Sequence, residues 1–260
     1  MKVVIFCGGK GTRLKEETEY RPKPMVPVGG RPILWHIMKV YASQGHRDFV
    51  LCLGYKGEMI KNYFRNYLWN AGDITMKLGK NPAPIYHDGH EEEDWTVTLA
   101  DTGEESGTCT RLRRVERHLG DDQEFLLTYG DGVGDIPVNQ TIDVHLQTGK
   151  LITVTAVRPP GRFGDLKLRP DGTVSGFDEK PQSGGGWING GFFVISRKIF
   201  RNLEQYPDVM FERGPLQDFA KAGQLHAYRH DGFWQPMDTV VEYQYLNRIW
   251  EEKKAPWKIW

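Results

Sequence analysis

The sequence has 260 residues, 39% of them hydrophobic, with 34 Lys and Arg balanced by 34 Asp and Glu. This composition excludes a disordered, collagen-like or coiled-coil chain, and without a basic excess we expect no nucleic-acid partner. No stretch approaches about 18 apolar residues, so we expect neither a membrane span nor a signal peptide. Three scattered cysteines, Cys7, Cys52 and Cys109, indicate a reducing compartment, and we expect the cytoplasm.

The first 150 residues alternate apolar runs with amphipathic stretches. Continuous, mostly apolar runs that end at glycine predict strands over Val3–Cys7, Phe49–Leu53 and Phe125–Tyr129, and further strands are expected over Ile74–Leu78 and Thr96–Ala100. Helical spacing of apolar residues predicts helices from Pro32 to Gly45, over Ile60–Leu68 and over Leu112–Leu119. This alternation favours an α/β fold with a Rossmann-like, mostly parallel sheet, helices on both faces and ligands beyond the carboxyl ends of the strands.

The chain after residue 150 looks more antiparallel and richer in loops. Strands are expected over Leu151–Val157, Asp165–Leu168, Val174–Phe177 and Gly191–Ile195. Helices are expected over Leu216–Ala222 and Val240–Trp250. We therefore predict one domain over residues 1–260, in which 151–260 form a smaller, partly antiparallel substrate-binding half on the same sheet.

A glycine-rich loop, Gly8-Gly9-Lys10-Gly11-Thr12-Arg13-Leu14, follows the first strand. Glycines let backbone N–H groups approach a phosphate, and Arg13 adds a forked cation. The alternative is a tight turn between strand and helix. A dinucleotide fingerprint would need glycine where Leu14 stands, and the Lys-Ser/Thr order of a Walker loop is absent, so neither NAD nor P-loop chemistry is supported.

Further along, Lys23 lies between Pro22 and Pro24, which stiffen the backbone into an extended segment. A rigidly presented ammonium suits a phosphate, although a surface lysine in a proline-rich loop is the alternative reading.

Two carboxylates are candidates for holding Mg²⁺, which at nucleotides is typically bound by one or two carboxylates and phosphate oxygens. Asp131 follows a buried strand, and Asp238 precedes a predicted helix. A turn aspartate and a helix N-cap are the respective alternatives. Asp135 is a weaker third candidate.

Three other groups of residues carry side chains that could form sites. Asp178, Glu179 and Lys180 at a strand end could grip a sugar phosphate or form an exposed turn. His87 and His90 lack further ligands at metal-site spacing, so a loop is favoured there. Cys7 is expected to be a core residue, since no His–acid pattern accompanies it.

Together these motifs resemble the sugar-1-phosphate nucleotidyltransferase family, in which G-G-x-G-T-R-L, P-K-P, a strand-end Gly-Asp, E-K-P and a late metal-binding Asp occur in this order. The resemblance covers nearly the whole chain, and its most specific segments are Ile33–Lys39, Pro159–Gly164, Ile188–Phe193, Gly232–Thr239 and Lys254–Lys258. It implies the nucleotidyltransferase fold, with residues 1–150 as the nucleotide half and 151–260 as the sugar-phosphate half. It further implies that CTP and α-D-glucose 1-phosphate give CDP-glucose and pyrophosphate with Mg²⁺.

The resemblance also implies roles for individual residues. The nucleotide is contacted by Gly8, Gly9, Gly11, Thr12, Arg13, Lys23, Ser106, Arg111 and Gly130. The metal is held by Asp131 and Asp238, and catalysis depends on Arg13, Lys23 and Asp131. The sugar phosphate is contacted by Gly164, Glu179, Lys180 and Asn189.

Several alternatives stay open within and beyond this resemblance. UTP or dTTP could replace CTP, and Asp165 and Trp187, where smaller residues are usual, leave a modified hexose possible. A non-catalytic paralogue that senses nucleotide sugars is a further alternative. Family members are usually homo-oligomers, and Asn81–Trp95 is expected to supply contacts between subunits. The product would serve deoxysugars of bacterial surface polysaccharide such as lipopolysaccharide O-antigen.

Overall fold

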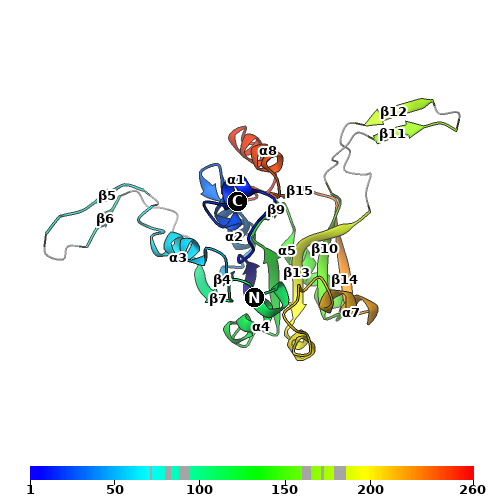
Figure 1. Ribbon diagram of the computed structural model, residues 1–260, viewed down its shortest axis with the longest axis horizontal. Helices are drawn as coiled ribbons and strands as arrows, with labels where there is room; N and C mark the ends of the chain where they lie inside the picture. The colour runs from blue at the N-terminus through cyan, green and yellow to red at the C-terminus, as the bar shows by residue number, and fades with distance from the viewer. Residues whose placement is uncertain (71, 80–82, 88–93, 160–164, 171–172, 179–185) are drawn as a thin grey trace.

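The computed structural model describes residues 1–70, 72–79, 83–87, 94–159, 165–170, 173–178 and 186–260. A seven-stranded sheet in the order β14-β10-β13-β8-β1-β4-β7 forms its centre (Figure 1). These strands are Leu225–His230, Ile152–Val157, Ile188–Ser196, Glu124–Tyr129, Val3–Phe6, Asp48–Leu53 and Thr96–Asp101.

All neighbours in this sheet are parallel except around β13, which is antiparallel to both β10 and β8. The expectation of a mostly parallel sheet is confirmed. The expectation of a more antiparallel second half is only partly correct, because β10 and β14 are themselves parallel. Since β10, β13 and β14 come from the second half of the chain, both halves share one sheet.

The central strand β1 shows why the sheet is covered on both sides. Its four residues are all buried, and alternate side chains enter two separate cores. The core containing Val3 is closed by α2 (Ile33–Ala42), α5 (Val138–Thr148) and α8 (Val240–Glu251). The core containing Val4 is closed by α4 (Thr108–Val115), α6 (Phe200–Leu203) and α7 (Pro215–Lys221).

The remaining elements are short, apart from α3 (Gly57–Arg65). The short helices are α1 (Lys15–Thr18), η1 (Lys23–Met25), η2 (Glu116–His118) and η3 (Arg197–Ile199). Four two-stranded antiparallel sheets pair β2 (Pro27–Val28) with β3 (Arg31–Pro32), β5 (Ile74–Thr75) with β6 (Ile85–Tyr86), β9 (Gly132–Gly134) with β15 (Trp234–Pro236), and β11 (Asp165–Leu168) with β12 (Val174–Asp178).

The structure corrects several predicted elements. The predicted strand at Ile74–Leu78 is only two residues long, and the helix expected from Leu112 begins earlier, at Thr108. No element was predicted for α5, whose mainly polar sequence buries only four side chains, or for β14, an edge strand with little buried surface. Both lack the continuous apolar run that made the central strands recognisable.

The C-terminal segment is fixed by an aromatic cluster around the buried His36 of α2. Trp250 and Trp260 lie against the His36 ring, and the Trp257 indole N–H donates to His36 Nδ1 at 3.3 Å. The other ring nitrogen, Nε2, contacts the Val28 carbonyl at 2.8 Å, so it carries the proton. Burial lowers the pKa of His36 to about 4. This cluster holds α8 and the tail that follows it against α2.

Among the residues that the structure describes, no helix has the length and apolarity needed to cross a bilayer.

Candidate active site

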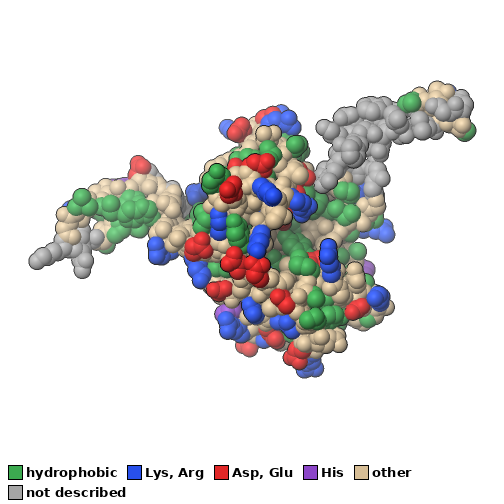
Figure 2. Space-filling view, viewed as in Figure 1, with side chains coloured by type: hydrophobic (Ala, Val, Ile, Leu, Met, Phe, Trp, Pro, Cys, Tyr) green, Lys and Arg blue, Asp and Glu red, His purple; other side chains and the backbone are tan. Residues whose placement is uncertain are grey.

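A cavity of about 1840 Å³ opens beyond the carboxyl ends of β1 and β8. Acidic and basic side chains lie side by side around the middle of the face seen in Figure 2. The described residues to which the resemblance assigns a role all line this cavity: Gly8, Gly9, Gly11, Thr12, Arg13, Lys23, Ser106, Arg111, Gly130, Asp131, Asn189 and Asp238. Gly164, Glu179 and Lys180 lie outside the described residues.

The Gly8 carbonyl anchors the start of the glycine-rich loop. It accepts hydrogen bonds from Arg111 Nη2 at 3.1 Å and from the Tyr55 N–H at 3.2 Å. A β-carbon at Gly8 would lie 2.1 Å from Arg111 Nη1, so any other residue there would displace the Arg111 guanidinium. Gly11 has a φ of +62°, the left-handed conformation that glycine adopts without strain. The loop conformation therefore depends on glycine at both positions.

Arg111 is a buried hub beneath this loop. Besides Gly8, its guanidinium donates to the Leu53 carbonyl at 3.0 Å, the Thr102 hydroxyl at 2.9 Å and the Glu104 carbonyl at 3.0 Å. These partners follow or end β1, β4 and β7, so one side chain ties three strand ends together. Its donors are largely used by the protein itself, an arrangement the sequence did not reveal.

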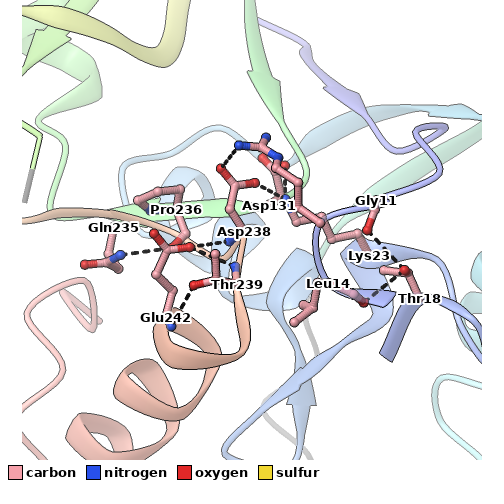
Figure 3. A network of polar contacts seen from close by, with 11 residues as sticks. Gly11, Leu14, Thr18, Lys23, Asp131, Gln235, Pro236, Asp238, Thr239 and Glu242 are labelled. Carbon is pink, nitrogen blue, oxygen red and sulfur yellow. Dashed lines mark hydrogen bonds and ion pairs between the residues drawn. The ribbon is translucent and has the colours of Figure 1, made fainter. Parts of the chain in front are cut away.

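Four charged side chains meet at one wall of the cavity (Figure 3). Lys23 Nζ bonds Asp131 Oδ2 at 2.8 Å and also bonds Asp238 Oδ1, while Arg13 Nη1 lies 2.7 Å from Asp238 Oδ2. The Lys23 side chain is only 8% exposed, whereas that of Arg13 is 69% exposed. Burial alone would lower the pKa of Lys23, but the two carboxylates outweigh it and raise that pKa. Lys23 is therefore a charged ammonium between two acids.

The two carboxylates meet because of the β9–β15 ribbon. Gly132, the first residue of β9, pairs with Pro236, the last residue of β15. Asp131 comes just before β9 and Asp238 comes shortly after β15, so both acids lie at the same end of the ribbon. The Met237 N–H donates to the Asp131 carbonyl at 2.8 Å and ties the two turns together.

A capping box at the start of α8 then fixes the backbone of Asp238 (Figure 3). Glu242 Oε2 accepts from the Asp238 N–H at 2.7 Å and from the Thr239 N–H at 2.9 Å. The Thr239 hydroxyl accepts from the Glu242 N–H at 3.3 Å in return. Glu242 is thus a positioning residue that sequence analysis missed, although its S/T-x-x-E spacing was a usable signal.

A second polar group lines the cavity around Glu212. The Tyr129 hydroxyl donates to Glu212 Oε1, and the Thr108 hydroxyl donates to Glu212 Oε2 at 3.0 Å. Burial and the neighbouring Glu212 raise the pKa of Tyr129. Asn189 lies nearby and accepts from the Gly191 N–H at 2.7 Å. Glu212 thereby links the start of α4 to β8, a contact between distant segments that no local motif predicts.

The other candidates lie away from this cluster. Asp135 contacts His230 at 2.8 Å and does not line the cavity. His87 contacts the Thr75 hydroxyl, and His90 lies outside the described residues. Cys7 is fully buried in the core, as expected, and borders the cavity. The Trp187 ring centre lies 4.5 Å from the guanidinium carbon of Arg158, and Trp187 is not among the described residues that line the cavity.

Comparison with known proteins gives consistent matches. A family model described as nucleotidyl transferase matches residues 2–235. Over the full length of both chains, the sequence is 50% identical to a glucose-1-phosphate cytidylyltransferase of Salmonella typhimurium and 42% identical to a probable glucose-1-phosphate cytidylyltransferase of Bacillus subtilis. The crystal structure of HddC from Yersinia pseudotuberculosis superimposes with a TM-score of 0.67 at 24% identity, covering 96% of this chain and 99% of that chain, which indicates a shared fold.

Proposed function

This chain belongs to the nucleotidyl transferase family, and on that premise we propose that it transfers a cytidylyl group from CTP to α-D-glucose 1-phosphate, giving CDP-glucose and pyrophosphate. The observation that carries the proposal is the cluster of Arg13, Lys23, Asp131 and Asp238 on one wall of the cavity. The names of the 50% and 42% identical relatives support the choice of CTP and glucose 1-phosphate.

The reaction joins two polyanions, and the chain's residues serve mainly to offset their charge. An oxygen of the hexose phosphate attacks the α-phosphorus of CTP, and pyrophosphate leaves. Because a phosphate is already ionised, no protein nucleophile or general base is needed. Backbone N–H groups of the Gly8–Gly11 loop approach the nucleotide, Arg13 stabilises the departing pyrophosphate, and Lys23 neutralises phosphate charge near the reacting centre. Asn189 contacts the sugar phosphate.

The carboxylates of Asp131 and Asp238 fit Mg²⁺, which we propose as the cofactor. The position between them already holds the positive charge of Lys23, and a hard divalent cation prefers carboxylate oxygens. Among the described residues, no group of three or more His, Cys, Asp or Glu side chains is placed to hold a metal. Oxygens of the nucleotide phosphates would supply further ligands to an ion held by Asp131 and Asp238. When bound, the ion neutralises charge at the reacting phosphate.

The test is pyrophosphate release from a grid of CTP, UTP, dTTP and ATP against several hexose 1-phosphates, with and without Mg²⁺. Turnover confined to CTP with glucose 1-phosphate supports the proposal. Turnover with another pair would keep the transfer chemistry and change the specificity. Absence of pyrophosphate in folded protein that binds nucleotide would instead favour a nucleotide-sugar-sensing paralogue, a reading that the complete set of charged residues disfavours.

We further propose that the protein is a homo-oligomer. The β5–β6 hairpin extends from the body beside α3 (Figure 1), and its segment exposes Met76, Leu78 and Ile85, with Leu78 95% exposed. An apolar hollow of about 360 Å³, lined by residues that include Tyr67 and Trp95, lies beside β7 at the edge of the sheet. Large exposed apolar groups of this kind mark protein–protein contacts. Sedimentation as a monomer at micromolar concentration would refute this proposal.

The three free, buried cysteines support a reducing compartment, and we propose the cytoplasm. There the product would supply deoxysugars for surface polysaccharide.

A further inference from the structure

The carboxylates of Asp131 and Asp238 are already neutralised by the chain's own cations. Lys23 contacts both of them, and Arg13 contacts the second oxygen of Asp238. Three of their four oxygens therefore have a cationic partner within the protein. The proposed function assigns the same two cations to the CTP phosphates, and Lys23 and Arg13 cannot serve the carboxylates and the phosphates fully at the same time.

Lys23 and a divalent ion compete for one position. The Lys23 ammonium contacts one oxygen of each carboxylate, and a divalent ion held by Asp131 and Asp238 would draw on the same two carboxylates. The Lys23 side chain is only 8% exposed, so a second cation held by the same two carboxylates would be repelled by the ammonium with little screening from water. Binding of a metal is therefore favoured when the Lys23 ammonium moves away.

We propose that Lys23 is an exchangeable counter-ion, which holds the two carboxylates until the metal replaces it and then moves onto the nucleotide phosphates. The proposal rests on the proposed function for the identity of the phosphate ligand, but not for the competition between Lys23 and the metal. Lys23 is suited to this exchange, because the flanking Pro22 and Pro24 restrain its backbone while its four-carbon side chain can turn.

Arg13 contributes less to this exchange. Its side chain is 69% exposed, and an exposed ion pair is weak because water and salt screen it. A metal or a nucleotide that binds alone must break the buried ion pairs of Lys23. When both bind, the metal becomes the counter-ion of the carboxylates and the phosphates become the counter-ion of Lys23. Binding of the metal therefore favours binding of the nucleotide, and the reverse.

The first experiment measures Mn²⁺ binding to the full chain without nucleotide, from the free Mn²⁺ signal in electron paramagnetic resonance. We expect Lys23→Met to bind Mn²⁺ at least about tenfold more tightly than the unmodified chain, because no ammonium has to be displaced. The matched control is Lys10→Met, which removes the same charge from the neighbouring loop, where Lys10 pairs with Glu105. Its Mn²⁺ affinity should stay within about twofold.

The second experiment measures CTP binding in the presence of EDTA, and so tests the binding of Lys23 to phosphate when no metal is available. Asp131→Asn releases Lys23 from one carboxylate, so we expect metal-free CTP to bind several-fold more tightly. Asp135→Asn removes a carboxylate that contacts His230 instead and should leave this affinity unchanged. Lys23→Met should weaken it.

Unchanged or weaker Mn²⁺ binding by folded Lys23→Met would overturn the proposal, and so would an equal gain in Lys10→Met. If Lys23→Met fails to fold, Lys23→Gln keeps a hydrogen-bond donor without the charge and carries the same expectation. The outcome is separable from the proposed function: tighter Mn²⁺ binding without pyrophosphate release would leave the exchange standing and refute the transferase activity. Turnover by the unmodified chain, together with equal Mn²⁺ affinities of that chain and Lys23→Met, would support the transferase activity and refute the exchange.

Discussion

Acid should weaken the fold through His36, the buried histidine that anchors the C-terminal segment. Its pKa is lowered to about 4 by burial, while an unfolded histidine titrates near 6.5. Between these values the unfolded chain binds a proton that the folded chain refuses. The contribution of neutral His36 is therefore fully present above pH 6.5 and is lost as the pH falls towards 4.

The size of this effect follows from the shift. About 2.5 pKa units correspond to about 3 kcal/mol when the loss is complete, and about 2 kcal/mol is lost between pH 7.5 and pH 5. For a chain of this size, 2 kcal/mol corresponds to a fall in Tm of about 4–8 °C. Because His36 fixes the tail after α8, we expect Trp257 to become exposed in the same transition.

Urea unfolding at a series of pH values, followed by tryptophan fluorescence, measures this directly. His36→Gln cannot take up a proton, so it should be less stable at pH 7.5 but should lose about 2 kcal/mol less than the unmodified chain on going to pH 5. Other groups titrate equally in both proteins and cancel in the difference. Parallel stability curves for the two proteins would refute the reasoning.

Three further predictions concern the cavity. Asp131→Asn should lower kcat about 100-fold or more while the fold persists, because a neutral amide replaces a charged ligand; near-normal turnover at saturating Mg²⁺ would reject Asp131 as a ligand. Arg13→Ala should lower kcat about 100-fold with little change in Tm, since its exposed ion pair is weak, and a change in KM alone would mean that Arg13 binds only the ground state. Gly8→Ala should lower the free energy of unfolding in urea by about 3 kcal/mol, because its β-carbon would displace Arg111. Gly9→Ala has nothing within 4 Å of its β-carbon and should lower that free energy by less than about 1 kcal/mol. Equal losses in the two variants would contradict this explanation.

The central strands could be predicted because a strand that is buried on both faces consists almost entirely of apolar residues. β1, β4 and β8 are nearly continuous apolar runs, since neither face can carry polar side chains. The edge strand β14 and the helix α5 bury one side only and mix polar with apolar residues, so their pattern is weaker. What an element buries thus decided whether it could be predicted.

The site was predictable in its parts but not in its pairing. The types of Lys23, Asp131 and Asp238 suggested phosphate and metal binding, and all three line one cavity. That Lys23 lies between the two acids depends on contacts across 108 and 215 residues of sequence, which no local motif encodes. The hydrogen bonds of Arg111 and Glu212 are long-range in the same way.

The β9–β15 ribbon also sets the time at which this chain becomes able to bind during synthesis. Asp131 emerges roughly a hundred residues before Asp238, a delay on the order of 5–20 s at ordinary translation rates. Throughout that delay Lys23 and Asp131 are present without the second acid, and Met237 has not yet fastened the two turns together. The pair of carboxylates on the cavity wall is therefore complete only after β15 has been made, and the capping box that fixes Asp238 follows with the last helix, α8.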